Sequence, residues 1–279
     1  MVLRGEVIYS QPALEIVCSP WLVGAPLAAL SRAASADWLR SLPAGALGAS
    51  PVSLEILNGG HYYYVAGAAD DVCGAAAPRC AVASLRAKRS HDDDTGAWRV
   101  RVWDRAGAPL AGASALLIGD TLATGTTLAG VLLAVADELR QAGAACPPVY
   151  VFAIAGASAA EAALADAGAA LRAAGGSLHL TFANAAFALW TDGTDLRFTG
   201  PDARWHPRAL AELPAALGAD WAPADVKCAC FDWGDRFRDA EAHLAELEHW
   251  CHSLPKPLPA RLRRGLEAAR AGAPWAVPA

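Results

Sequence analysis

The sequence has few charged residues and no overall positive charge. Charged residues make up 18% of the 279-residue chain, and the formal net charge is −5. Proteins that bind nucleic acids generally present a basic face. We therefore expect no nucleic-acid partner, and any anionic ligand has to be bound by local features of the chain.

Disulfide, secretion and membrane signals are also missing. The seven cysteines are an odd number without the spacing of a disulfide framework, which is typical of reduced thiols. Residues 1–11 carry Arg4 and Glu6 and lack the apolar core of a signal peptide. The uncharged stretch 142–160 is interrupted by Pro147-Pro148 and consists mostly of small residues, so it favours a buried strand over a membrane span. We expect a cytoplasmic protein without a membrane partner.

Apolar residues account for 54% of the chain, and strand-like and helix-like segments alternate along it. This alternation predicts an α/β fold with a doubly wound, mostly parallel sheet. The Asn58-Gly59-Gly60 triplet between two apolar runs predicts a β-hairpin joining 52–57 to 61–65. The predicted strands cover 7–9, 14–17, 52–57, 61–65, 81–87, 98–103, 115–118, 149–154 and 178–182. The predicted helices cover 25–42 and 159–174, and a third has its helical spacing from Leu128 to Leu139 and is ended by Gly143.

Residues 115–130 carry the most specific pattern. Ala115 to Ile118 form an apolar run typical of a buried parallel strand, and a helical apolar spacing begins at Leu128. The segment 124–127, Thr-Gly-Thr-Thr, therefore lies at a helix N-terminus, where unpaired N–H groups and the helix dipole favour a phosphate. Asp120 at the strand's carboxyl end is placed to accept hydrogen bonds from sugar hydroxyls. No Gly-Lys-Ser/Thr, Gly-x-Gly-x-x-Gly or Gly-x-Ser-x-Gly sequence offers another interpretation.

This segment resembles the phosphoribosyl pyrophosphate motif of type I phosphoribosyltransferases. That motif has an apolar run, two acidic residues, three further residues and then Thr-Gly with small or hydroxyl positions; here Gly119 stands at the first acidic position and Asp120 at the second. The resemblance implies that phosphoribosyl pyrophosphate is bound by Thr121, Ala123, Thr124, Gly125, Thr126 and Thr127. It also implies Mg²⁺ as cofactor, with Asp120 as a metal-binding and catalytic residue that stabilises the sugar, and allows a homodimer.

A second predicted feature is the strand ending in Lys88-Arg89, followed by the acidic segment 90–96. In the family, a strand ending in basic residues precedes a loop that closes over pyrophosphate, so Lys88 and Arg89, with Arg86 as a further candidate, are expected to neutralise the leaving group. The alternative is that this stretch is an ordinary solvent-exposed surface hairpin with no role in binding. The segment 18–26 is likewise a candidate second anion-binding loop or a plain turn before a helix.

The resemblance implies a phosphoribosyltransferase-like core over residues 1–185 and a C-terminal α+β hood over 186–279. The hood is expected to contain a hairpin around 192–193, a strand over 228–233 and helices over 240–251 and 260–270. Its aromatic and acidic side chains are candidates for binding the acceptor, with core packing as the alternative for the tryptophans. These candidates are Trp190, Asp195, Asp232 and Trp233.

The function predicted on this basis is transfer of a phosphoribosyl group to a nitrogenous base or similar small acceptor, with release of pyrophosphate. Two alternatives stay open. One is a non-catalytic sensor or partner subunit that binds phosphoribosyl pyrophosphate or a nucleotide, which Gly119 in place of an acid favours. The other is an enzyme acting on a different ribose-phosphate ester with the same phosphate loop.

Overall fold

The computed structural model describes most of the chain. It covers residues 3–57, 59–74, 77–92, 97–190, 196–198, 200, 202–218, 233–253 and 260–272. For residues 91, 92, 97, 98, 233–235 and 250–253 it describes the backbone alone.

A seven-stranded sheet forms the centre of the structure, and all of its neighbouring strands but one pair run parallel. In spatial order the strands are β1 (Glu6–Ile8), β8 (Ser177–Ala183), β6 (Pro148–Ala153), β5 (Ala115–Gly119), β2 (Pro51–Leu57), β3 (Ala81–Asp92) and β4 (Ala97–Gly107). Only β4 is antiparallel to its neighbour, β3. Every residue of β5 is buried, as the continuous apolar run predicts for a parallel strand covered on both faces.

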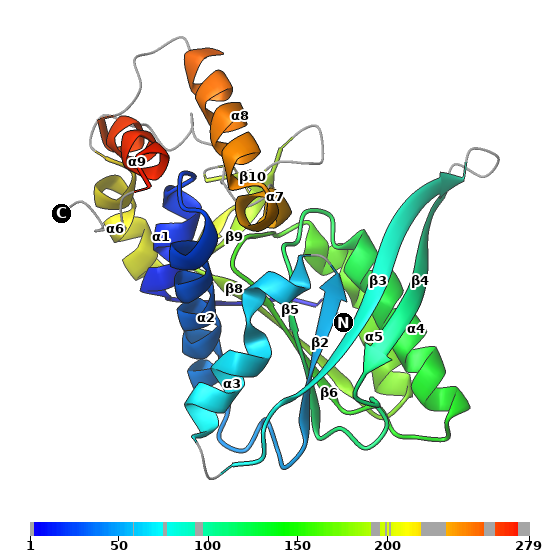
Figure 1. Ribbon diagram of the computed structural model, residues 1–279. Helices are drawn as coiled ribbons and strands as arrows, with labels where there is room; N and C mark the ends of the chain where they lie inside the picture. The colour runs from blue at the N-terminus through cyan, green and yellow to red at the C-terminus, as the bar shows by residue number, and fades with distance from the viewer. Residues whose placement is uncertain are drawn as a thin grey trace.

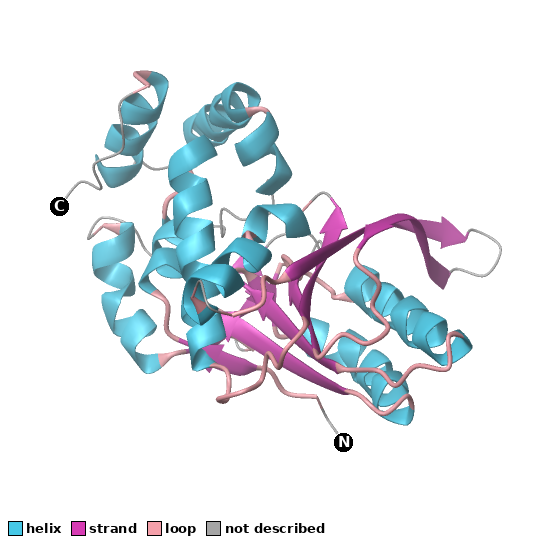
Figure 2. Cartoon of the chain, turned by 60° about the horizontal axis from the view of Figure 1, so that its bottom comes forward, coloured by secondary structure: helices cyan, strands magenta, loops and turns pink. Residues whose placement is uncertain are grey.

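Helices cover both faces of the sheet, as Figure 1 and Figure 2 show. One layer contains α1 (Gln11–Cys18), α2 (Gly24–Ser41) and α3 (Val65–Cys73), and the other contains α4 (Thr126–Gln141) and α5 (Ala160–Ala173). Neighbouring side chains of a strand point to opposite faces, so Leu117 packs in the core under the first layer and Leu116 in the core under the second. This arrangement confirms the expected α/β fold with a mostly parallel sheet between helices.

The strand order reverses between β2 and β5. From β2 the chain passes through α3 to β3 on one side, whereas β5 lies on the other side of β2 and leads through α4 to β6. In doubly wound sheets, ligands bind outside the carboxyl ends of the strands at such a reversal. The segment that follows β5, residues 120–125, begins at this point.

The C-terminal part adds a small sheet and further helices. The short strands β7 (Gly156–Ala157), β9 (Ala185–Leu189), β10 (Leu196–Arg197) and β11 (Arg204–Trp205) pair around β9. The helices are α6 (Pro207–Leu217), α7 (Trp233–Arg238), α8 (Ala240–Ser253) and α9 (Ala260–Arg270). Their buried leucines belong to the same core cluster as α1 and α2, so residues on both sides of the predicted boundary at 185/186 share one core. In the described part of the chain, no helix combines the length and apolarity needed to cross a membrane.

The hairpin predicted around Asn58-Gly59-Gly60 is wrong. After β2 the chain forms a 3₁₀-helix, η1 (Gly60–Tyr63), and continues directly into α3. Two serines of α2 hold this segment, because the Ser31 hydroxyl donates to the Tyr62 carbonyl at 2.6 Å and the Ser35 hydroxyl to the Tyr63 carbonyl at 2.7 Å. These tertiary hydrogen bonds override the local turn preference.

One other predicted strand is helical, and a second lies mainly outside the described residues. Residues 14–17 lie in α1, where Ser10 accepts from the Ala13 N–H as N-cap and Pro12 occupies the first turn. Every residue from Ala13 to Cys18 is buried. The segment therefore lacks the alternation of apolar and polar faces from which a helix is predicted. The predicted strand 228–233 lies mainly outside the described residues, but Trp233, its last residue, begins α7. The turn predicted at 192–193 also lies outside them, between the antiparallel strands β9 and β10.

A fully buried asparagine joins the two sheets. Asn184 lies between β8 and β9 with a φ of +64°, a conformation that asparagine tolerates better than most residues. Its side-chain oxygen accepts from the Ser10 N–H at 3.0 Å, and its amide nitrogen donates to the Ser10 carbonyl at 2.8 Å. Asn184 thus fixes the start of α1 against the end of β8.

Asn184→Ala is expected to lower the free energy of unfolding by about 1–3 kcal/mol. It leaves the buried Ser10 N–H unpaired, which costs about 1–3 kcal/mol, whereas the Ser10 carbonyl keeps the hydrogen bond from the Leu14 N–H. Asn184→Gly relieves the positive φ and should recover part of the loss. Urea unfolding of the three proteins measures these differences, and an alanine variant as stable as the original chain would contradict this role.

Candidate functional site

The loop between β5 and α4 is shaped by one glycine. Gly125 is the N-cap of α4 and has a φ of +74°, in the left-handed region that favours glycine. A Cβ atom at this position would lie 3.0 Å from the Ala160 Cβ and 3.1 Å from its backbone. Gly125 is therefore required both by its own conformation and by the close approach of α5.

The N–H groups of this loop are available to a ligand. Among the described residues, no acceptor lies within hydrogen-bonding distance of the backbone N–H groups of Ala123, Thr124, Gly125, Thr127 and Leu128. The Thr126 N–H makes a single long contact, at 3.5 Å, with the Thr124 hydroxyl. The start of the loop is anchored instead. The Asp120 N–H donates to the carbonyl of Phe152 in β6, and the Leu122 N–H donates to the carbonyl of Ala155, just after β6. An anchored loop with unpaired N–H groups at a helix N-terminus is an anion-binding arrangement.

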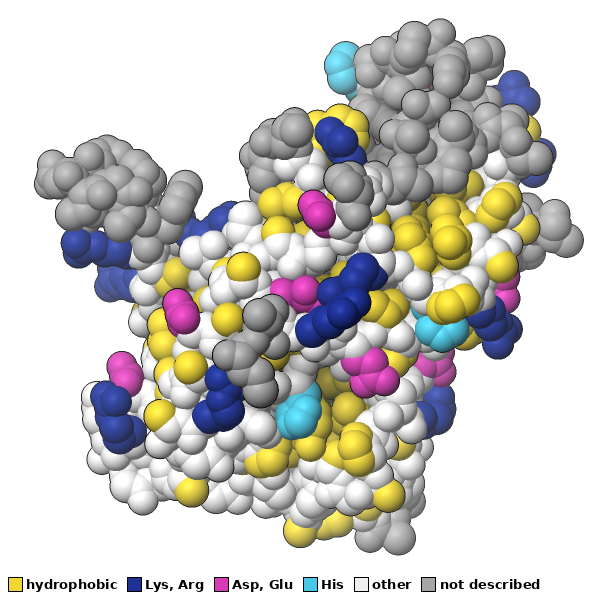
Figure 3. Space-filling view, turned by 180° about the vertical axis from the view of Figure 1, so that it is seen from behind, with side chains coloured by type: hydrophobic (Ala, Val, Ile, Leu, Met, Phe, Trp, Pro, Cys, Tyr) yellow, Lys and Arg dark blue, Asp and Glu magenta, His cyan; other side chains and the backbone are white. Residues whose placement is uncertain are grey.

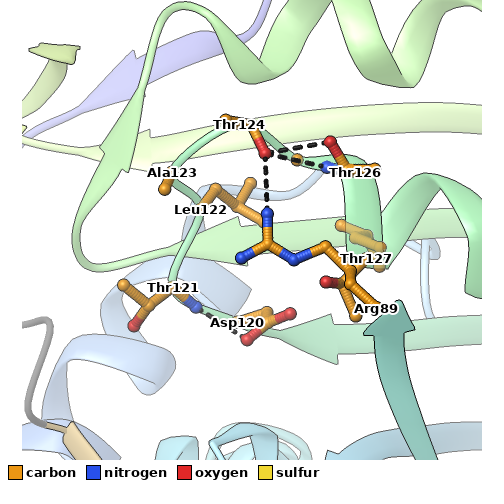
Figure 4. Close-up of a pocket in the computed structure, with 10 residues that line it drawn as sticks. Arg89, Asp120, Thr121, Leu122, Ala123, Thr124, Thr126 and Thr127 are labelled. Carbon is orange, nitrogen blue, oxygen red and sulfur yellow. Dashed lines mark hydrogen bonds between the residues drawn. The ribbon is translucent and has the colours of Figure 1, made fainter. Parts of the chain in front are cut away.

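These groups line a pocket of about 210 Å³. Figure 4 shows it in close-up: Arg89 reaches in from β3, with Thr124 and Thr126 on one side of its guanidinium and Asp120 and Thr121 on the other. The hydroxyls of Thr124 and Thr126 lie 2.9 Å apart and are positioned to share a bound oxygen atom. All the loop residues predicted to bind phosphoribosyl pyrophosphate contribute to the pocket: Thr121, Ala123, Thr124, Gly125, Thr126 and Thr127.

The structure brings only one of the two predicted basic residues to this pocket. The Arg89 guanidinium donates to the Thr124 hydroxyl at 3.4 Å (Figure 4). Lys88 precedes it on β3 and, because side chains alternate along a strand, lies on the opposite face with Arg101 and Trp103. Arg86 shares the face of Lys88 and lies 3.6 Å from the Asp104 carboxylate.

Asp120 lies at the floor of the pocket, half-buried, directly after β5. Burial raises the pKa of its carboxyl to about 7, although the Thr121 N–H, 2.9 Å from Oδ1, acts in the opposite direction. Within the described residues, no basic side chain forms an ion pair with it. A carboxyl group with this pKa changes its charge near neutral pH, which is typical of functional sites.

Gly119 is the position where the family motif has its first acid, and Tyr63 fills the space beside it. A Cβ atom on Gly119 would lie 2.5 Å from the Tyr63 Cβ. The Tyr63 hydroxyl lies 3.1 Å from the Thr121 hydroxyl and accepts from the Ile154 N–H at 3.3 Å. Tyr63 thus links η1 to the loop that carries Asp120. Sequence reasoning missed this role, because the hairpin prediction placed Tyr63 on a strand.

The predicted hood residues are only partly described. The Trp190 ring is half-buried and stacks with the Arg197 guanidinium, 4.0 Å from its centroid. Trp233 begins α7, and its side chain is not described. Asp195 and Asp232 lie outside the described residues. Trp190 does not line the pocket formed by the loop between β5 and α4.

The segment 18–22, part of the second candidate anion loop, is buried against the C-terminal helices. Arg236 of α7 donates to two carbonyls of this segment at 2.8 and 2.9 Å, and His243 of α8 lies 2.8 Å from a third. The segment presents carbonyl oxygens to basic side chains rather than N–H groups to an anion. The structure therefore favours a docking role for this loop.

Metal-binding side chains are sparse at the site. In the part of the chain that the structure describes, no group of three or more His, Cys, Asp or Glu side chains is placed to hold a metal ion. Asp120 is the single carboxylate among the described residues that line the pocket. Such a donor set fits Mg²⁺ carried largely by substrate phosphates and water, because Mg²⁺ commonly binds through one or two carboxylates plus phosphates.

Comparisons with known proteins give little guidance. No protein-family model matches the sequence, and no curated protein matches it. Among solved structures, the chain is similar to a hypothetical protein from Neisseria gonorrhoeae with bound ppGpp, at 15% sequence identity. The match covers 54% of this chain and 71% of that chain, with a TM-score of 0.28. We therefore base the function on the site's own geometry.

Gly125→Ala is expected to weaken binding of ribose 5-phosphate at least about tenfold, because the added Cβ meets α5 and shifts the loop. Gly143→Ala is the matched control. Gly143 also has a positive φ, +64°, but has no atom within 4 Å of an added Cβ and lies beyond the other end of α4. Isothermal titration with ribose 5-phosphate should show a loss in the first variant only, and equal losses would contradict a specific role for the loop.

Gly119→Ala is expected to lower the free energy of unfolding by about 1–3 kcal/mol, since it overpacks Tyr63 against β5. The control is Gly168→Ala in α5, where an added Cβ makes ordinary contacts, the nearest at 3.4 Å. Urea unfolding compares the two, and a Gly119→Ala variant as stable as Gly168→Ala would show that Tyr63 does not restrict this position.

Proposed function

We propose that this chain is a phosphoribosyltransferase-like enzyme that transfers a phosphoribosyl group from phosphoribosyl pyrophosphate to a nitrogenous base or similar acceptor. The observation that carries the proposal is the row of unpaired N–H groups in a pocket at the reversal of strand order. These groups, with the threonine hydroxyls, would bind the 5-phosphate.

Asp120 supports the ribose part of the proposal. It lies at the carboxyl end of β5 and lines the same pocket as the phosphate loop. A carboxylate there would accept hydrogen bonds from the ribose hydroxyls and stabilise positive charge that develops on the ring as the C1–O bond breaks. Tyr63 would act as a positioning residue, because its hydroxyl lies 3.1 Å from that of Thr121, the next residue.

Arg89 supports the leaving-group part. It extends from β3 across the pocket to Thr124, so its guanidinium lies over the phosphate loop (Figure 4). We assign it to the pyrophosphate, which leaves with the electron pair of the C1–O bond while the acceptor nitrogen forms a bond to C1 and loses a proton to water. Mg²⁺ bound with the substrate would lower the charge of this leaving group.

The acceptor would bind beside the contact of η1 with α7, on the side of Asp120. Tyr62 of η1 stacks on Phe237 of α7, with ring centroids 4.3 Å apart, so these elements lie side by side. An added Cβ on Gly59, just before η1, would lie 3.7 Å from the Asp120 carboxylate. An acceptor held there would reach the ribose from the side of the sheet where β2 ends. Trp233, at the start of α7, therefore stays a candidate residue for contacting the acceptor.

A non-catalytic sensor of the same ligand is the second candidate. It is favoured by the single carboxylate of the pocket, since Tyr63 occupies the space of a second one beside Gly119. A sensor needs the phosphate loop but not the stabilisation of a transition state.

A pyrophosphate-release assay separates the two functions. With phosphoribosyl pyrophosphate, Mg²⁺ and a panel of purine, pyrimidine and pyridine bases, the enzyme should release pyrophosphate with at least one acceptor. Asp120→Asn should lower kcat/KM at least about 100-fold while changing the dissociation constant of the ligand less than about tenfold. Asp137→Asn, on the exposed face of α4, is the control and should keep full activity. Binding without release for any acceptor would favour the sensor.

The rate should also depend on pH through Asp120. Its pKa of about 7 means that the carboxyl group is neutral below neutral pH and charged above it. Because the charged form of Asp120 accepts hydrogen bonds from the ribose hydroxyls, kcat/KM should rise about tenfold per pH unit up to about pH 7 and then level off. Asp120→Asn should lose this dependence and retain only the titration of the substrate phosphates. A profile unchanged by the substitution would exclude Asp120 as the titrating group.

A further inference from the structure

The strands β3 and β4 extend beyond β2 as a two-stranded arm with two different faces. The pairing of β3 with β2 ends at Arg86, whereas its pairing with β4 continues to Asp92 (Figure 1). The inner face packs on α4, where Val100 lies so close to Gly130 that a Cβ there would be 2.4 Å from the Val100 Cβ. The outer face faces away from α4.

Basic side chains concentrate on the outer face. Lys88 pairs directly with Arg101, and the neighbouring pairs are Arg86 with Trp103 and Ser90 with Arg99. Figure 3, which views the molecule from behind, shows Lys and Arg side chains near the tip of this arm, at the left of that view. Like charges directly opposite each other destabilise a strand pair, and a bound anion would relieve the repulsion between Lys88 and Arg101.

The outer face is also hollow. Lys88, Ser90, Arg101 and Trp103 line a depression of about 500 Å³, within the size range of small-molecule sites. The Trp103 ring is half-buried, and the Arg101 guanidinium lies 5.9 Å from its centroid, at the outer limit of a cation–π contact. Among the described side chains, no carboxylate pairs with Lys88 or Arg101. Exposed Lys and Arg side chains on an edge strand can also serve to prevent pairing with another sheet. That role does not explain why the Trp103 indole lies beside them in a depression.

We propose that this outer face is a second ligand site, which binds a nucleoside di- or triphosphate. The base would stack on Trp103, and Lys88 and Arg101 would bind the phosphates, with the Ser90 hydroxyl as an additional donor. The hollow has room for one nucleotide, and the negative net charge of the chain disfavours a longer nucleic acid. Lys88 and Arg89, adjacent on β3, then serve two different ligands on opposite faces of one arm.

The test is isothermal titration of the full chain with ATP and with inorganic tripolyphosphate. ATP should bind, and tripolyphosphate should bind at least about tenfold more weakly because it lacks a base to stack on Trp103. Lys88→Ala, Arg101→Ala and Trp103→Leu should each weaken ATP binding at least about tenfold. Arg40→Ala, an exposed residue of α2, is the charge-matched control and should bind ATP as the original chain does.

The phosphate loop provides a further control. Gly125→Ala, which alters that loop, should change the affinity for ATP less than about twofold if the two sites are separate. The proposal is overturned if ATP does not bind, if tripolyphosphate binds as tightly, or if Gly125→Ala abolishes binding while Lys88→Ala does not. Tighter binding of a single-stranded oligonucleotide than of ATP would likewise overturn it. Because the readout is nucleotide binding alone, its outcome is independent of phosphoribosyl transfer.

Discussion

The contact between Gly125 and α5 is the constraint on which the site depends. Its left-handed backbone turns the chain from β5 into α4 where Ala160 leaves no room for a side chain. Hydrogen bonds to β6 and the segment after it hold the start of the loop, so the N–H groups at positions 123–125 and 127–128 stay unpaired and line a pocket. An open cluster of donors at a helix N-terminus costs little to maintain, because those groups have no partner within the helix.

The second determinant is Tyr63. By packing on Gly119 it excludes a side chain at the end of β5, and its hydroxyl reaches the residue after Asp120. Among the described residues, the pocket therefore contains one half-buried carboxyl group, with a pKa of about 7. Under the proposed function, a single carboxylate repels a polyanionic substrate less than a pair would, and the substrate would have to supply most of the donors to Mg²⁺.

The parts of the structure that local sequence determines could be predicted. The apolar run of β5, the Thr-Gly-Thr-Thr segment and the spacing from Leu128 were enough to locate β5, the loop that follows it and α4. The helix η1 could not be predicted, because hydrogen bonds from Ser31 and Ser35 on a distant helix fix it. Burial of α1 on all sides removed the amphipathic pattern that would have shown it to be a helix. Lys88 and Arg89 lie on opposite faces because β3 continues past the predicted end of the strand at residue 87.

The most direct test of the central claim is a crystal structure of the chain with ribose 5-phosphate bound. The account predicts that phosphate oxygens lie within hydrogen-bonding distance of the backbone N–H groups of residues 124–127, with the ribose hydroxyls toward Asp120. A phosphate bound elsewhere, with these N–H groups donating to protein acceptors, would contradict it.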